Sequence, residues 1–165
     1  MKYLEELNYA KENKETFKKI LTKIQKDKNK KMDLVFSDLH DKTFRKIDCL
    51  SCANCCKTTS PIFRDIDIKR ISKRLRQTEK QFVSENLRLD EDKDYVLKKS
   101  PCLFLESDNT CRIYEDRPLA CREYPHTDRK NIYQIMDLTI VNAEICPAVS
   151  QIVKTIQLNI EKKSN

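Results

Sequence analysis

Eight cysteines in a chain of 165 residues constrain this protein more than any other feature of its sequence. Four of them fall within eight residues, in the segment CLSCANCC, and two of these are adjacent: Cys49, Cys52, Cys55 and Cys56. The other four stand singly, further along the chain: Cys102, Cys111, Cys121 and Cys146. A cysteine pattern this dense indicates either disulfides or a bound metal, and the cellular compartment helps to choose between them.

The N-terminal segment has one early lysine but lacks the apolar stretch of a secretory signal. No segment approaches the ~20 apolar residues of a membrane span. We therefore expect a cytoplasmic protein without a membrane partner, in which thiols stay reduced and bind metal. The alternative is that some cysteines are small buried apolar side chains. The polar neighbours Ser51, Asn54 and Lys57 disfavour that alternative for the first four.

Glycine is absent from the sequence, and this absence excludes several classes of enzyme. The chain has no nucleotide-binding loop, no glycine-rich dinucleotide turn and no glycine-hinged serine nucleophile. It also shows no Ser/His/Asp set and no obvious pair of carboxylates, and its only histidines are His40 and His126. Whether the protein is an enzyme stays open at this point.

Apolar spacing predicts a mainly α fold with a small β-hairpin. Helical periodicity covers residues 3–31, and it returns in a helix that begins at Pro147. Thr78 and Gln81 match a capping box at the start of another helix. We expect a single cysteine-rich, metal-centred domain packed by helices at both ends: a helical arm at 1–44, a metal-binding domain at 45–150 and the rest of the C-terminal helix at 151–165.

Two short runs of β-prone residues predict the hairpin. Residues 102–105 and 111–114 flank the turn-forming segment 106–109, so that Cys102 and Cys111 lie on either side of it. Residues 132–141 are rich in apolar side chains but do not distinguish strand from helix.

The spacing of the first four cysteines allows more than one grouping. If residues 49–56 form a helical turn, Cys49, Cys52 and Cys56 share one face and Cys55 points elsewhere, whereas a loop permits other sets. Cys146 precedes a helix, whose dipole favours a thiolate. Thiolates hold zinc in closed four-cysteine sites and also hold iron–sulfur clusters. Eight thiols fit two zinc ions, one cluster with spare cysteines, or two clusters.

The cysteine pattern resembles that of the YkgJ-type CxxCxxCC cysteine-cluster family of zinc- or iron-chelating proteins. The resemblance rests on CLSCANCC from Cys49, on the segment PCLFLESDNTCRIYEDRPLACREYP and on the pair Cys146–Pro147. It implies that the eight cysteines bind a metal centre, either zinc or an iron–sulfur cluster of the [4Fe–4S] type. Many relatives carry an aromatic residue after the tyrosine–proline pair, where this chain has His126, a possible extra ligand or an ordinary loop histidine.

Charged and polar side chains between the later cysteines are candidates for supporting the centre. Arg117, Arg122 and Tyr124 stand close to Cys121, and arginines near thiolates compensate negative charge and donate to sulfur. The alternative is that they are ordinary surface residues. A basic helix over 69–76 suggests contact with an acidic partner or a solvated face, but interspersed acidic residues disfavour nucleic acid.

Three functions follow from these observations. The first is a metal-centre protein that transfers electrons, senses redox state or supports chemistry on a protein partner. The second is a cluster-dependent enzyme that modifies proteins by methyl transfer, since the longer relatives include flagellin lysine methylases. The third is a zinc-stabilised module for interaction or nucleic-acid binding.

Overall fold

The computed structural model describes residues 3–164 and divides the chain into two compact units. Unit 1 comprises residues 1–52 and 125–165, and unit 2 comprises residues 53–124. The chain therefore leaves unit 1 inside the cysteine motif and returns after Tyr124. The division into domains drawn from the sequence stays a prediction.

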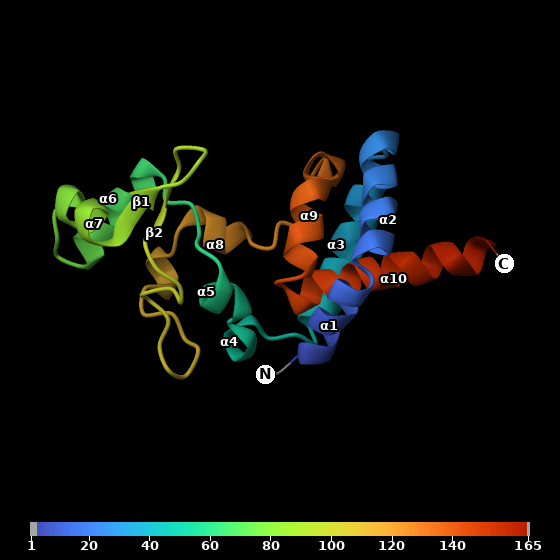
Figure 1. The fold of residues 1–165 in the computed structure, drawn as a ribbon, viewed down its shortest axis with the longest axis horizontal. Coiled ribbons are helices and arrows are strands. Elements are labelled where there is room, and N and C mark those ends of the chain that lie inside the picture. The colour runs from blue at the N-terminus through green and yellow to red at the C-terminus, as the bar shows by residue number, and fades with distance from the viewer. Residues whose placement is uncertain (1–2, 165) are drawn as a thin grey trace. The chain divides into compact units, whose positions relative to one another are not determined.

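Unit 1 is a bundle of helices in which the first and last segments of the chain pack together. Its elements are α1 (Leu4–Glu12), α2 (Lys14–Asp27), α3 (Lys31–Phe44), α4 (Cys49–Cys52), the 3-10 helix η2 (Ile132–Ile135), α9 (Met136–Ala143) and α10 (Pro147–Ser164). Helix α10 runs across α2, α3 and α9 (Figure 1). It buries Val149, Ile152, Val153 and Ile156, which share one face at helical spacing. This confirms the helix predicted from Pro147.

The predicted N-terminal helix is interrupted near its start. Asn13 separates α1 from α2, and both its backbone N–H and its side-chain amide donate to the Tyr9 carbonyl at 3.0 Å. Residues 132–141, which the sequence left ambiguous, form η2 and most of α9. The Asp33 carboxylate fixes this segment, since it accepts the backbone N–H groups of Asn131 and Ile132 at 2.8 and 2.9 Å.

Unit 2 combines short helices with one pair of strands. Its elements are α5 (Asn54–Thr58), α6 (Asp65–Arg74), α7 (Glu79–Asn86), β1 (Leu87–Leu89), β2 (Tyr95–Leu97), the 3-10 helix η1 (Tyr114–Asp116) and α8 (Leu119–Glu123). Its core includes eight buried side chains: Phe63, Ile68, Ile71, Phe82, Leu87, Leu97, Phe104 and Ile113. The partly buried Cys102 and Cys111 pack against this core. The apolar core of unit 2 therefore reaches the segment that carries two of the cysteines.

The structure is mainly helical with one small antiparallel hairpin, which confirms the predicted fold class. The hairpin joins β1 to β2, pairing Leu87 with Leu97. It does not lie at 102–114, where the sequence placed it: that segment forms only an isolated antiparallel bridge, between Leu105 and Cys111. The predicted capping box does begin α7, where Thr78 and Gln81 bind each other's backbone N–H groups. No helix among the described residues is long and apolar enough to cross a membrane.

Candidate metal centre

The cysteine motif is divided between two short helices. Cys49 and Cys52 begin and end α4, whereas Cys55 and Cys56 lie in α5. Between the helices, Ala53 adopts the left-handed conformation, with φ 48° and ψ 20°. A single helical turn over 49–56 is therefore wrong as a description of the motif. The break sends the two halves of the motif into different units.

Unit 2 gathers four cysteines from four segments: Cys56, Cys102, Cys111 and Cys121. The backbone N–H of Cys102 donates to the carbonyl of Cys56 at 2.8 Å, which joins two segments that are far apart in the sequence. The bridge between Leu105 and Cys111 closes the loop that starts at Cys102. Cys121 lies on α8, two residues after the helix begins.

Burial and the charges of neighbouring thiols both raise the pKa values of Cys102, Cys111 and Cys121. Burial, together with the charges of Cys56, Cys102 and Cys111, raises the pKa of Cys121 to about 12. Burial likewise raises the pKa of Cys102 to about 11, with the charges of Cys56 and Cys111 adding to the effect. Like charges interact in this way only when they are close together in a poorly solvated region. A bound cation would stabilise all of these thiolates at once and displace their protons.

Unit 1 contains a second group of thiols, Cys49, Cys52 and Cys146. Cys146 is buried immediately before α10, and its carbonyl accepts the N–H of Ser150 at 3.1 Å. Burial raises the pKa of its thiol to about 12, and the charges of Cys49 and Cys52 raise it as well. Cys146 stands immediately before α10, and the dipole at a helix N-terminus favours a thiolate.

Backbone N–H groups are directed at the sulfur atoms in both units. The sulfur of Cys102 accepts hydrogen bonds from the backbone of Phe104 and Leu105, and these bonds lower its pKa against the effect of burial. The sulfur of Cys146 accepts from Ala148 and Val149 in the same manner. Hydrogen bonds to sulfur favour the thiolate and are one of the means by which proteins tune thiolate-bound metals.

Cys55 differs from the other cysteines of the motif. Its side chain forms a hydrogen bond with Cys56, and this bond is the largest cause of the lowered pKa of the Cys56 thiol. Burial of Cys56 opposes that effect, and the charge of Lys57 adds to it. The adjacent thiols of Cys55 and Cys56 on α5 therefore interact. Within the unit 2 group, Cys56 is the thiol that loses its proton most readily.

A buried carboxylate holds the segment that carries Cys121, and the sequence did not reveal it. Asp67 on α6 is 1% exposed and binds the Arg70 guanidinium at 2.7 Å. It also accepts the backbone N–H of Leu119, the first residue of α8, at 3.3 Å. Arg70 in turn donates to the carbonyls of Asp116 and Arg117 at 3.1 and 2.9 Å. Arg70 of the basic helix thus has a structural role in the segment before α8, whereas Lys69, Lys73, Arg74 and Arg76 are exposed, as in a solvated face.

The arginines near Cys121 fall into two kinds. The charge of Arg117 lowers the pKa values of Cys111 and Cys121, although burial outweighs it at both thiols. Arg122 instead donates to the backbone carbonyls of Arg117 and Glu115, at 3.1 and 2.7 Å, and braces the turn that precedes α8. Tyr124 ends α8, with its backbone N–H bound to the carbonyl of Ala120. A supporting role toward a metal stays a prediction for all three.

The two histidines occupy different settings in unit 1. The ring of His40 lies 2.8 Å from the Thr127 hydroxyl through Nδ1 and packs on Phe44, with centroids 4.4 Å apart. His126 adopts the left-handed conformation, with φ 64°. Its role as an extra ligand stays a prediction.

The chemistry of these side chains fits zinc or iron, both of which accept thiolate ligands. The set comprises grouped cysteines, N–H donors directed at sulfur and a nearby arginine charge. Among residues 3–164, no three Cys, His, Asp or Glu side chains stand in positions ready to hold a metal ion. The assignment of all eight cysteines as ligands therefore stays a prediction.

Comparison with protein families gives one match. The CxxCxxCC model, described as a "putative zinc- or iron-chelating domain", matches residues 48–147. The chain belongs to the CxxCxxCC family. The match runs from the residue before the first cysteine of the motif to the residue after Cys146, so it includes every cysteine of this member. No curated protein and no solved structure matches the chain.

Proposed function

We propose that this CxxCxxCC protein binds metal at two separate thiolate centres, one in each unit. The observation that supports the proposal is the division of the cysteines: the thiols of each group influence one another's pKa inside a single compact unit. Two centres also account for more of the cysteines than one centre does, because seven of the eight cysteines then belong to a group. Cys55, bound to Cys56, is the remaining thiol.

The unit 2 group is proposed to be a closed site. Four thiolates complete the tetrahedral shell of a zinc ion, and they equally provide the four ligands of a [4Fe–4S] cluster. Such a shell leaves no position for a substrate, so its role is to stabilise the fold or to carry an electron. Zinc would supply the first role, and a cluster would supply the second.

The unit 1 group is proposed to be an open site, because Cys49, Cys52 and Cys146 are three ligands only. Catalytic metal sites commonly have three protein ligands and one exchangeable position. This group is therefore the place for a reaction on a protein partner, the second function that the sequence suggested. His126 belongs to the same unit and is the candidate that would close the site instead.

Metal counting on paired variants tests the proposal. The protein is purified without oxygen, its visible spectrum is recorded, and iron, sulfide and zinc are measured per chain. Cys121→Ser should lose the unit 2 metal and retain the unit 1 metal, and Cys146→Ser should do the reverse. A brown protein with acid-labile sulfide identifies a cluster, and a colourless protein with stoichiometric zinc identifies zinc. Both variants losing all metal while remaining helical would contradict two separate centres.

The histidine variants distinguish an open unit 1 site from a closed one. His126→Ala should leave the metal count of unit 1 unchanged if the site is open and should weaken retention if the histidine is a ligand. His40→Ala is the matched control, since His40 contacts Thr127 and Phe44. Equal metal loss in both histidine variants would show that the effect comes from the fold.

A further inference from the structure

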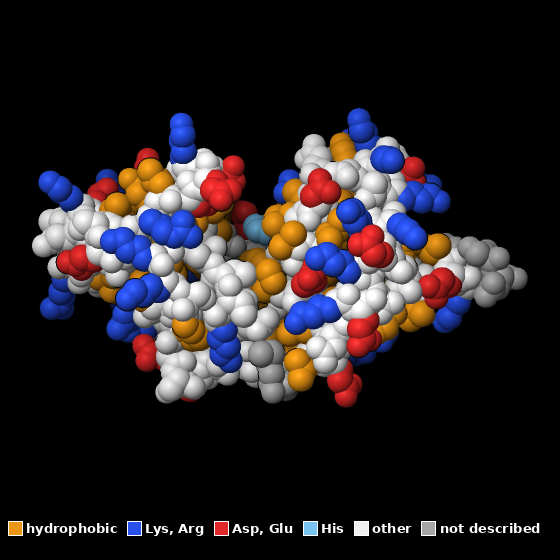
Figure 2. Space-filling model, in the orientation of Figure 1, with side chains coloured by type: hydrophobic (Ala, Val, Ile, Leu, Met, Phe, Trp, Pro, Cys, Tyr) orange, Lys and Arg blue, Asp and Glu red, His pale blue; other side chains and the backbone are white. Residues whose placement is uncertain are grey.

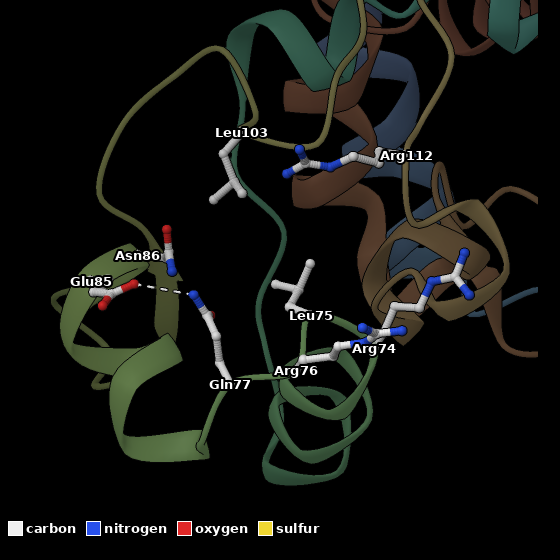
Figure 3. A pocket seen from close by; sticks show the side chains of 8 residues that line it. All are labelled: Arg74, Leu75, Arg76, Gln77, Glu85, Asn86, Leu103 and Arg112. Atoms are coloured by element: carbon white, nitrogen blue, oxygen red, sulfur yellow. Dashed lines mark hydrogen bonds between the residues drawn. The ribbon is translucent and has the colours of Figure 1, made fainter.

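A hollow lined by arginines lies in unit 2, among side chains with no assigned role. Its volume is about 410 Å³, and it opens to solvent. The residues that line it come from the end of α6 and the following turn, the end of α7, and the segment 102–112: Arg74, Leu75, Arg76, Gln77, Glu85, Asn86, Leu103 and Arg112. Figure 3 shows these side chains around the opening, with the guanidinium of Arg112 extending toward Leu103. The volume falls within the range of sites that bind small molecules.

The backbone of α6 holds Arg76 at this hollow in an unfavourable conformation. Arg76 has φ 55°, and its N–H binds the carbonyl of Lys73 while the N–H of Gln77 binds the carbonyl of Ser72, at 3.1 and 3.0 Å. These two bonds form a Schellman motif, in which the left-handed residue is usually glycine. An arginine there costs stability. Strained positions of this kind concentrate at functional sites, which favours a binding role for the Arg76 side chain.

The three arginines have little internal compensation. Arg74 approaches Asp116 only to 3.7 Å and Arg112 approaches Glu106 only to 4.0 Å, and both arginines are more than half exposed. Arg76 has no ion pair among residues 3–164. Surface pairs this long and this exposed contribute almost nothing. The guanidinium groups therefore have no close carboxylate partner among the described residues, although that of Arg112 lies over the Phe104 ring, 5.9 Å from its centroid.

The one acidic residue of the lining is already engaged. The side-chain amide of Gln77 donates to the Glu85 carboxylate at 3.3 Å, and Figure 3 shows this bond on the side of the hollow formed by α7. This bond orients the carboxylate without neutralising it, and the excess of positive charge comes from three arginines standing against one carboxylate.

Alternation along the segment 102–112 places an apolar surface beside the arginines. Cys102 packs against the core of unit 2, whereas its neighbour Leu103 lines the hollow and is 38% exposed. Cys111 and Arg112 repeat the arrangement after the bridge between Leu105 and Cys111. Leu75 adds a second apolar side chain from the turn after α6. The hollow thus combines guanidinium groups with an exposed apolar patch.

We propose that this hollow binds a small organic anion, in which a phosphate or carboxylate group is attached to an apolar body. The planar guanidinium groups bind the oxygens of such a group in pairs. Leu75 and Leu103 contact the apolar body. Polynucleotide binding fits less well, because unit 2 has 15 lysines and arginines against 13 aspartates and glutamates. Figure 2 shows the two signs interspersed on the visible face, without the continuous positive track that a polyanion needs.

Equilibrium dialysis with matched probes tests the proposal on the metal-loaded full chain. Phenyl phosphate and benzoate share an aromatic ring and differ in the anionic group, and benzyl alcohol keeps the ring without charge. Saturable binding of an anionic probe, with a dissociation constant at or below about 1 mM, supports the site. The preferred probe decides between phosphate and carboxylate. Equal binding of benzyl alcohol, or no saturable binding of either anion, would overturn the proposal.

Substitutions at left-handed positions supply a sharp control. Arg76→Gly removes the guanidinium and relieves the backbone, so it should raise the Tm while weakening probe binding about tenfold. Lys93→Gly relieves an equivalent strained position in the same unit, at φ 64°, and removes the same charge away from the hollow. It should bind the probe as the wild type does. Equal weakening of probe binding in both variants would show that the effect comes from net charge, and it would contradict the proposed site.

Arg112→Gln provides a second variant from another segment of the lining. It preserves the length and polarity of the side chain and should weaken binding about tenfold. Unchanged affinity in both Arg76→Gly and Arg112→Gln would contradict the assignment. Metal content is measured on the same samples, so a failure of the two metal centres remains distinguishable from a failure of this site.

Discussion

The charge of a single arginine reaches two of the unit 2 thiols. Arg117 stacks on the ring of Tyr114, with its guanidinium carbon 3.8 Å from the ring centroid, and donates to the Tyr114 carbonyl. The guanidinium is fixed by these contacts, and its charge lowers the pKa of both Cys111 and Cys121. A fixed positive charge beside thiolates stabilises them in the metal-bound state, where four thiolates on zinc leave an excess of negative charge.

Replacing Arg117 should therefore weaken metal binding in unit 2. Arg117→Met retains a long side chain for the Tyr114 ring and removes the charge, so metal affinity should fall about tenfold. Competition with a chelator, followed by metal analysis, measures the change. Arg122→Ala is the comparison, because its guanidinium binds carbonyl oxygens and its effect should be smaller. An equal loss of affinity in the two variants would show that bracing of the turn, and not charge, is what Arg117 supplies.

The conformation of Ala53 decides which cysteines belong together. An alanine at φ 48° has its Cβ close to the carbonyl oxygen, and the left-handed region costs it about 1 kcal/mol. The chain contains no glycine that would remove this cost. The structure around the turn between α4 and α5 must therefore stabilise it.

Ala53→Gly should stabilise the protein by up to about 1 kcal/mol and leave its metal content unchanged. Ala53→Val should do the opposite, because a β-branched residue is strongly disfavoured at positive φ. Thermal unfolding with metal analysis measures both properties. Destabilisation by glycine would mean that the methyl group, which is buried, contributes more through packing than it costs through the backbone.

At the scale of elements, Asp67 links α6 to the start of α8. Burial alone would raise the pKa of this carboxyl, but bonds from the Arg70 side chain and from backbone N–H groups outweigh burial and lower it. The ionised form is therefore the one that stabilises the fold. The contribution is fully present above the ordinary pKa of 3.8, and it is lost as the pH falls through the lower value of the folded state.

Asp67→Asn should lower the free energy of unfolding by about 2 kcal/mol at neutral pH, because the amide cannot replace charged bonds to Arg70. The difference between wild type and variant should begin to shrink below about pH 4, where the carboxyl of the unfolded chain takes up a proton, and should be lost once the folded carboxyl is protonated at lower pH. Denaturant titrations at several pH values measure this difference. A gap that stays constant down to pH 2 would show that the charge of Asp67 does not carry the stabilisation.

Local patterns predicted the elements that depend on neighbours in the sequence. The capping box at Thr78 and the helix from Pro147 are set by residues within one or two turns, and both are present. The sequence did not predict the hairpin of Leu87–Leu89 with Tyr95–Leu97, because pairing of such short strands is decided by packing of the core. The residues 102–114 had suitable β-prone runs and form only a bridge.

The grouping of the cysteines also could not be predicted from neighbours in the sequence. Cysteine spacing identified the eight thiols, but the grouping depends on the φ angle of Ala53 and on the bond between Cys102 and Cys56, 46 residues apart in the sequence. The structural role of Arg70 was hidden because its acceptors, the carbonyls of Asp116 and Arg117, are equally distant. Sequence composition showed only a basic helix.

At the scale of the whole molecule, the two units differ in how much regular helix and apolar burial support them. Unit 1 contains helices of 14, 14 and 18 residues, with large buried side chains on α2 and α10. In unit 2, residues 100–124 contain only η1 and α8, of three and five residues. Helices this short are unstable without tertiary support. The thiol-bearing part of unit 2 therefore has little other than its sulfur atoms, the Asp67 network and one edge of the core to hold it.

Removing the metal should for this reason loosen unit 2 selectively. Treatment with a strong chelator under reducing conditions should accelerate amide hydrogen exchange across residues 100–124 by more than about tenfold, because a bound metal contributes several kcal/mol to the segment it joins. Exchange in α2 and α10 should change much less, since their protection comes from apolar burial. Cys121→Ser without chelator should reproduce the pattern, whereas Cys146→Ser should affect the start of α10 instead. Uniform loss of protection in both units would mean that the cysteines hold the molecule together as one cooperative structure.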